Sequence, residues 1–170
     1  MIGDMTDSRT DPPYVAPEKA MLVAWLDWHR ATLLVKCEGL SDQQLRTRSV
    51  PPSTMSLLGL VRHLADVERG WHRRTLEGAD ASGLFYNEAH PDGDFDLVDT
   101  ADVEEAFAAL AAEVAHARGV ADQMALDDTG TRHGETVSLR WVLVHLIEEY
   151  ARHNGHADLL RQRLDGAVGE

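Results

Sequence analysis

The sequence predicts an all-α protein, built as a four-helix bundle. Its apolar residues recur at helical spacing in four long segments, at about residues 18–38, 56–77, 100–124 and 138–164. The chain has 170 residues, of which 44% are hydrophobic, enough for one domain with a sizeable core. No β-rich segment of any length stands out in the sequence. Long amphipathic helices in one domain bury their apolar faces most simply against one another, as a bundle.

The first two helices are marked by their ends as well as by their apolar stripes. Gly39 follows the segment 18–38 and suits a helix C-cap. Ser41 and Gln44 then form a capping-box pattern, which predicts a short helical turn. The second long helix, at about 56–77, presents an apolar face made of Leu57, Leu60, Leu64, Val67 and Trp71.

The connection between the second and third helices, residues 79–99, is unusually long. It carries Gly, Asn, Asp and Pro, together with the aromatic residues Phe85, Tyr86 and Phe95. Aromatic side chains favour packing over the body of the protein, and structureless loops of this length are often functional covers. We therefore expect this connection to cover part of the bundle.

In the second half of the chain, Thr100 is expected to cap the third helix. Residues 127–137 are expected to form a turn-rich connection without strands. The fourth helix should begin near Ser138 and be closed by Gly166. These boundaries place a bundle domain at residues 18–166.

Composition restricts the partners and the compartment. Residues 1–17 are rich in Asp, Thr and Pro, and we expect a disordered tail that is not a signal peptide. The formal net charge of −13 argues against nucleic acid and anionic membrane, because both require clustered Lys and Arg. Cys37 is the single cysteine, so no intrachain disulfide can form, and we expect it to be buried rather than nucleophilic. The expected compartment is the cytoplasm.

The most informative residues lie in the fourth helix. Glu149 and His153 are four residues apart, so their side chains project from one face of that helix. The same face carries the aliphatic residues Val142, Leu146, Leu160 and Leu164. A carboxylate and an imidazole inside an apolar stripe are costly to bury unless something satisfies them. A divalent metal ion would do so, and this pair is interpreted as half of a metal site.

His63 is the best candidate for a third ligand, because it lies at the edge of the apolar face of the second helix. Two imidazoles and one carboxylate suit Zn²⁺ or a neighbouring divalent ion, and would leave positions open for water or substrate. The alternative is a polar helix face with intrahelical ion pairs, for which spacing alone gives equal support.

The remaining histidines have more than one interpretation. His145 and His156 border the same face, and could orient the ligands, replace one of them or be structural. His29 could line the pocket, although a packed histidine is the simpler interpretation. Glu68 and His72 are also four apart, but they fall away from the apolar stripe and are expected on a solvated face.

Three stretches resemble a known family. Residues 38–46 (EGLSDQQLR), 56–71 (SLLGLVRHLADVERGW) and 138–166 (SLRWVLVHLIEEYARHNGHADLLRQRLDG) are similar to the DinB-like superfamily, and more narrowly to its mycothiol-transferase branch. The resemblance covers nearly the whole chain from Glu18 onward. It implies an up-down-down-up four-helix bundle with a metal near one end of its core.

The resemblance also implies a ligand set. The mycothiol-dependent maleylpyruvate isomerase uses His, Glu and His, and the matching residues here are His63, Glu149 and His153. The chain lacks the additional C-terminal domain of that isomerase, so maleylpyruvate isomerisation itself is not expected.

The function that these features imply is metal-dependent thiol S-transfer. A divalent metal, Zn with Ni, Fe or Mn as alternatives, would activate a low-molecular-weight thiol, with mycothiol implied by the resemblance. The thiol would attack an electrophilic small molecule. Two alternatives stay open: a hydrolase that uses metal-bound water, and a non-enzymatic, stress-associated metal- or ligand-binding bundle. The resemblance also admits a homodimer, because homodimerisation through helix faces is common among such relatives.

Overall fold

The computed structural model describes residues 9–168. The predicted N-terminal tail lies partly outside these residues, since positions 1–8 are not described. Residues 9–17 contain no helix or strand, and the Arg9 guanidinium lies 4.7 Å from the centroid of the Trp28 ring. In the described part of the chain, no helix is both long enough and apolar enough to cross a bilayer.

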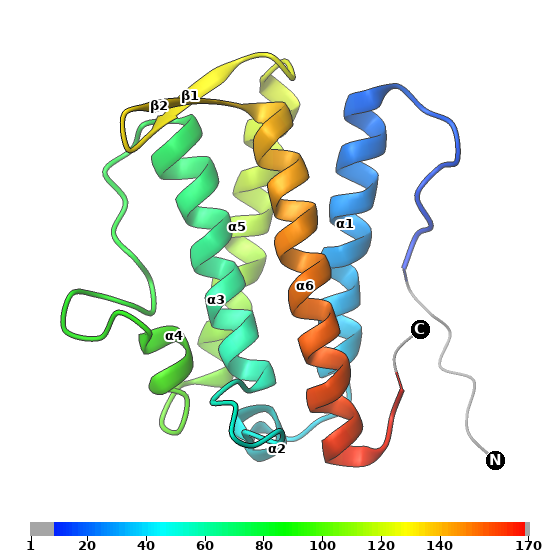
Figure 1. Ribbon diagram of the computed structural model, residues 1–170, viewed down its shortest axis with the longest axis vertical. Coiled ribbons are helices and arrows are strands. Elements are labelled where there is room, and N and C mark those ends of the chain that lie inside the picture. Colours follow the sequence, from blue (N-terminus) through cyan, green and yellow to red (C-terminus); the bar gives the residue numbers. More distant parts are fainter. Residues whose placement is uncertain (1–8, 169–170) are drawn as a thin grey trace.

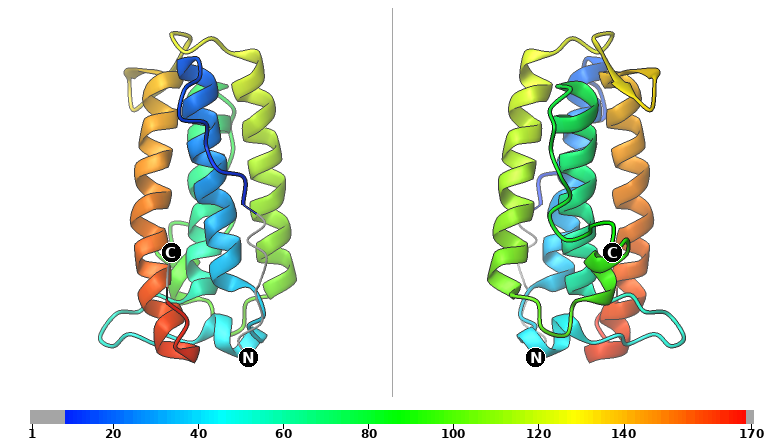
Figure 2. Two further views of the ribbon diagram at one scale, coloured as in Figure 1. Left: turned by 90° about the vertical axis from the view of Figure 1, so that its right-hand side faces the viewer. Right: turned by 90° about the vertical axis from the view of Figure 1, so that its left-hand side faces the viewer.

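Four long helices form the bundle, as predicted (Figures 1 and 2). They are α1 (Glu18–Cys37), α3 (Leu57–Arg69, continued by η1 at Gly70–Leu76), α5 (Val103–Gln123) and α6 (Leu139–Asp165). Figure 1 shows that α1 and α6 run in one direction while α3 and α5 run in the other, which confirms the up-down-down-up order. Helix α1 packs mainly on α6, and α3 packs mainly on α5. Helices α3 and α6 contact each other less extensively than either of these two pairs.

The parallel course of α3 and α5 explains the long connection between them. The chain leaves η1 at one end of the bundle and must return along its side to the end where α5 begins (Figure 1). On the way it forms the short helix α4 (Gly93–Asp96) and buries Ala81 and Val98. This confirms the prediction that residues 79–99 pack over the body.

Side-chain caps fix the starts of the helices. Ser56 and Ser138 accept hydrogen bonds from the backbone amides of Gly59 and Trp141, and begin α3 and α6 as predicted. The predicted capping box begins α2 (Asp42–Arg46). Thr100 was the wrong cap for α5, because Asp102 accepts from the Glu105 amide at 3.0 Å.

The expectation of a strand-free connection at residues 127–137 was wrong. Strands β1 (Thr129–Arg132) and β2 (Glu135–Ser138) pair antiparallel, with Thr129 opposite Ser138. The tight turn between them uses positive φ at His133 (51°) and Gly134 (85°). Two strands of four residues are too short to give a periodic hydrophobic signal.

The second helix was predicted to run to about residue 77, and η1 does continue α3 to Leu76. This last part is wound as a π-helix. The Thr75 hydroxyl donates to the Gly70 carbonyl five residues earlier, at 3.1 Å. The hairpin packs on this turn: a Cβ added at Gly130 would lie 1.9 Å from the Thr75 carbonyl oxygen. Gly130 therefore permits a backbone approach that no other residue allows.

The prediction that Glu68 and His72 lie on a solvated face was also wrong. Their exposed fractions are 0% and 1%. Glu68 accepts from Arg30 Nε at 2.7 Å, from Arg30 Nη2 at 2.8 Å and from the Tyr150 hydroxyl at 2.9 Å. His72 Nδ1 lies 3.4 Å from Glu68 Oε2. These four residues form a buried polar network that ties α1, α3 and α6 together.

Candidate metal centre

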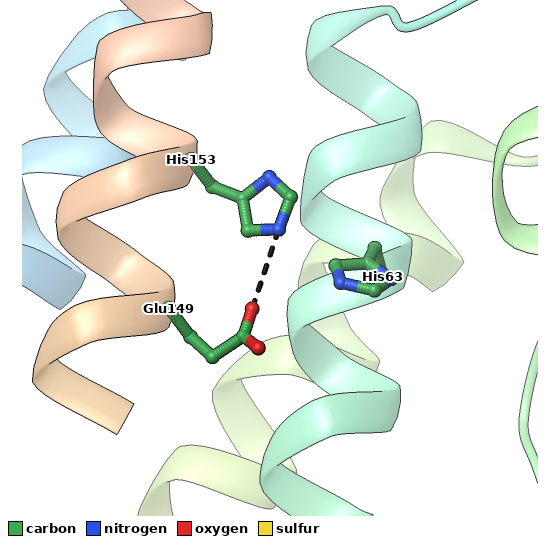
Figure 3. A group of neighbouring side chains, drawn as sticks. All are labelled: His63, Glu149 and His153. Carbon is green, nitrogen blue, oxygen red and sulfur yellow. Dashed lines mark ion pairs between the residues drawn. The ribbon is translucent and has the colours of Figure 1, made fainter. Parts of the chain in front are cut away.

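The three predicted ligands converge between α3 and α6 (Figure 3). His63 projects from α3, and Glu149 and His153 project toward it from successive turns of α6. One ligand atom from each residue lies within 4.8 Å of the other two. The centroids of the two imidazole rings are 4.8 Å apart, and His153 Nε2 lies 3.4 Å from Glu149 Oε2.

These separations suit a single small cation. Metal–ligand bonds of roughly 2.1 Å in tetrahedral geometry place ligand atoms roughly 3.4 Å apart. The His153–Glu149 pair already has this separation, and the three ligand atoms all lie within 4.8 Å of one another. The side chains are 27% (His63), 18% (Glu149) and 11% (His153) exposed, so the site is sheltered but reachable.

His153 is in the protonation state that a metal ligand requires. Burial, and then the neighbouring His63 and His156, lower the pKa of His153 to about 4. The ring is therefore neutral near pH 7. His153 Nδ1 lies 3.4 Å from His156 Nδ1, so His153 can donate an Nδ1–H hydrogen bond to His156 while its Nε2 faces Glu149. Of the roles left open for His156, this contact favours orientation of a ligand.

His63 is oriented by a residue that the sequence did not single out. Asp94, in α4, places Oδ2 2.8 Å from His63 Nδ1 and is itself buried. With Nδ1 bound to this carboxylate, His63 keeps Nε2 free to bind a cation, an arrangement typical of metal-ligating histidines. The long connection thus contributes to the site directly.

Residues of α3 hold the connection in this position. Arg62, which precedes His63, donates to the carbonyl oxygens of Gly93 and Asp94 at 3.0 and 3.1 Å. One turn later, Asp66 accepts from the backbone amides of Leu84 and Phe85 at 2.7 and 2.9 Å. Both anchors lie in the helix that carries His63, so the distance from that ring to the connection is well defined.

A cavity of about 450 Å³ opens beside the three residues, with His63 and Glu149 on its wall. This volume falls within the range of small-molecule sites. The lining also includes Trp71 and Arg74 of η1, Arg132 of the hairpin, and Tyr86 of the connection. The site can therefore hold a cation at one side and an organic molecule in the adjoining space.

The other histidines are now placed. His145 Nε2 lies 3.5 Å from Glu149 Oε1, and its ring stacks on Trp141 at 4.9 Å. His145 and Glu149 also form a second possible ligand group with Glu148, and the Glu148 side chain is exposed. His29 packs edge-on against Trp28, with ring centroids 5.2 Å apart, and does not line the cavity.

Several residues of the cavity were missed by sequence reasoning. Asp94, Arg74 and Arg132 follow no ligand spacing and lie in three different segments, so no local pattern could join them. The prediction that residues 79–99 form a functional cover was the one signal that pointed toward Asp94. Cys37, by contrast, was predicted correctly: it is 6% exposed, and burial raises its pKa to about 12.

Comparisons with known proteins agree with this architecture. A family model described as mycothiol S-transferase matches residues 21–166. The crystal structure of a conserved protein from Enterococcus faecalis is similar, with a TM-score of 0.66 and 18% sequence identity. The similarity covers 90% of this chain and 100% of the other, and it shows the fold alone. No curated protein matches the chain.

Proposed function

The chain belongs to the mycothiol S-transferase family, and we propose that it is a metal-dependent thiol S-transferase. In this proposal His63, Glu149 and His153 hold one divalent cation, Zn²⁺ with Ni²⁺, Fe²⁺ or Mn²⁺ as alternatives. Mycothiol is the proposed thiol, and a small electrophilic molecule is the second substrate. The observation that carries the proposal is the convergence of these three side chains beside a cavity.

The charge of the ligand set favours a thiol. A divalent cation bound by one carboxylate and two neutral imidazoles keeps one net positive charge, which an incoming thiolate would neutralise. Such a cation lowers the pKa of a bound thiol and so supplies a nucleophile at neutral pH. Asp94 and His156 contact the two imidazoles at Nδ1, so each ring would offer Nε2 to the cation.

The reaction then needs an electrophile within reach of the sulfur. The thiolate sulfur forms a bond with the electrophilic carbon, and the leaving group departs with its bonding electron pair. The thiol proton passes to solvent or to a nearby base. His145, 3.5 Å from Glu149, is the neighbouring imidazole that lines the cavity and can accept it.

Hydrolysis by metal-bound water is the alternative enzymatic proposal, and it requires a general base at the cavity. Glu148 does not meet this need, because its side chain is 46% exposed and pairs with Arg152. His145 is the remaining candidate. Turnover that depends on added thiol supports transfer, whereas turnover without thiol supports hydrolysis.

Metal content is the first test. Protein purified without an affinity tag or added metal should contain close to one divalent ion per chain by elemental analysis. His153→Ala should lose most of this metal because it removes one of three ligands. The control is His116→Ala, since His116 lies on α5 and pairs with Glu77 away from the site. Equal metal content in both variants would contradict the proposed ligand set.

Thiol binding is the second test. Titration calorimetry of the metal-loaded protein should detect mycothiol binding, and chlorodinitrobenzene should be conjugated at a rate that depends on both metal and thiol. A metal-loaded protein with neither activity would support the non-enzymatic alternative. The predicted homodimer is tested separately, by sedimentation of the purified protein.

A further inference from the structure

Two arginines line the cavity that adjoins the three candidate metal ligands. Arg74 lies in η1 and Arg132 in β1, and both line the cavity beside His63 and Glu149. Among residues 9–168 neither guanidinium forms an ion pair. This is unusual in a chain with a formal net charge of −13, in which carboxylates are abundant. Unpaired cations that share a small cavity suit an anionic ligand.

The contacts of these arginines position them and leave donors free. Arg74 donates to the Ala81 carbonyl at 2.9 Å and to the Tyr86 hydroxyl at 3.0 Å. Arg132 lies 4.0 Å from the centroid of the Trp71 ring and makes a single long hydrogen bond, 3.4 Å, to Thr75. A guanidinium carries more N–H donors than these contacts use. Both side chains are half-buried, so an ion bound there would be partly shielded from water.

The carboxylates of the cavity have other partners. Asp66 accepts two backbone amides of the connection, and Asp94 faces His63. Glu149 belongs to the proposed metal site. Asp92 is exposed at the rim of the cavity. These carboxylates share the cavity with the two arginines, but none of them forms an ion pair with either guanidinium, whose remaining N–H donors stay available. Burial, and then Arg74, lower the pKa of Arg132.

The local backbone brings each of these arginines to the cavity in a different way. Arg74 is in the π-helical turn, a form of helix that often marks functional sites. A Cβ added at Gly70 would lie 2.6 Å from Arg74 Nη2, so Gly70 leaves room for the guanidinium across the turn. Arg132 reaches the cavity because Gly130 lets the hairpin approach η1. Gly70 and Gly130 thus allow both guanidiniums to reach the same cavity.

We propose that Arg74 and Arg132 bind a carboxylate group of the electrophilic substrate, beside the three candidate metal ligands. This inference rests on the proposed S-transfer and names its substrate class: an electrophile that carries a carboxylate. With its carboxylate bound to the two arginines, the substrate would place its electrophilic carbon between these arginines and the thiol sulfur, which would lie beside the candidate metal ligands. Arg74 and Arg132 are in this view specificity-determining residues.

Binding can be tested without any reaction. Titration calorimetry with dinitrobenzoate, which lacks a leaving group, should show binding to the protein, whereas its methyl ester should bind more weakly. Arg132→Gln and Arg74→Gln should each weaken dinitrobenzoate binding roughly ten- to hundred-fold, the span of one charge-assisted interaction. Arg163→Gln is the matched control, because Arg163 is exposed at the end of α6 and this substitution removes the same charge. Equal weakening in all three variants, or none in any of them, would overturn the proposal.

Gly70→Ala tests position rather than charge. Its methyl group should displace the flexible end of Arg74 and weaken dinitrobenzoate binding, while net charge and fold are kept. Circular dichroism and thermal unfolding check the fold. Affinity equal to that of the unaltered protein, with the fold retained, would show that the placement of Arg74 does not matter and would contradict the proposal.

Turnover separates this inference from the proposed function. Chlorodinitrobenzoate and its methyl ester are compared as substrates with mycothiol, each rate being divided by its uncatalysed rate. In both, sulfur displaces chloride, which leaves with its bonding electrons. The acid should be preferred, and Arg132→Gln should abolish the preference.

Equal use of acid and ester would overturn the carboxylate site but keep S-transfer. Binding of dinitrobenzoate without any conjugation would instead contradict S-transfer. If dinitrobenzoate inhibits competitively against the thiol but not against the electrophile, the two arginines do not bind the electrophilic substrate.

Discussion

The Tyr150 hydroxyl should stabilise the helix pair that carries the candidate ligands. Tyr150 follows Glu149 in α6 and is 0% exposed. Its hydroxyl donates at 2.9 Å to Glu68, which lies in α3 one turn and a half after His63. The bond therefore joins the two ligand-bearing helices inside the core. Tyr150→Phe removes the bond and leaves the ring in place.

The magnitude follows from what remains after the substitution. Glu68 would keep both hydrogen bonds from Arg30, so its carboxylate would not be left without a partner. The loss is then that of one buried hydrogen bond to a charged group, about 1.5–3 kcal/mol. For a chain of this size each kcal/mol shifts the melting temperature by roughly 2–4 °C. The expected decrease in melting temperature is therefore roughly 3–12 °C.

Calorimetry or thermal circular dichroism of the metal-free protein measures this decrease. Tyr14→Phe is the matched control, because Tyr14 is fully exposed and its hydroxyl should contribute nothing. A decrease for Tyr150→Phe no larger than that of the control would refute the reasoning. A further check uses Glu68→Gln as background: a neutral acceptor is weaker, so the effect of Tyr150→Phe should be smaller there.

Two further predictions concern the hairpin and the buried histidine. Gly130→Ala should destabilise the protein and weaken dinitrobenzoate binding, because its Cβ would overlap the backbone of Thr75 and Leu76; unchanged melting and binding would contradict the close approach. Burial lowers the pKa of His72 despite the opposing effect of Glu68, with Arg30 and His116 acting in the same direction as burial. The stability that neutral His72 contributes should be complete above about pH 6.5, and be lost as pH falls from there toward the folded-state pKa. In denaturant titrations the free energy of unfolding of His72→Leu should fall less between pH 7 and pH 5 than that of the unaltered protein. An identical change with pH in the two proteins would contradict this.

Local patterns were enough to predict the bundle and to select the three side chains that converge. Helical periodicity is a short-range signal, and it placed Glu149 and His153 on one face before any packing was known. His63 required the further assumption that the second helix faces the fourth, which the bundle provides. That these residues hold a metal remains a prediction. The DinB-like resemblance supplied the order of the helices, which periodicity alone does not specify.

The error at Glu68 and His72 has a physical origin. Assigning a polar stripe to solvent assumes that a helix has one buried face, but α3 contacts α1, α5 and α6. Polar residues on its other faces are therefore buried too, and they are tolerated because they bond to one another. Arg30 and Tyr150, their partners, lie in helices distant in sequence, so sequence reasoning could not see that the burial was compensated.

The parts of the chain that sequence failed to predict are the parts that complete the cavity. The π-helical turn, the hairpin and α4 contribute Arg74, Arg132 and Asp94. The first departs from α-helical geometry, and β1 and α4 have only four residues each, too few for periodicity to detect. Local rules are commonly broken at functional sites, where a strained or irregular segment brings a side chain to a position that a regular helix cannot reach. The candidate metal ligands lie on regular helices and could be found from spacing. The residues proposed to recognise the substrate lie on a π-helical turn and on a four-residue strand, so specificity could only be inferred once the chain was folded.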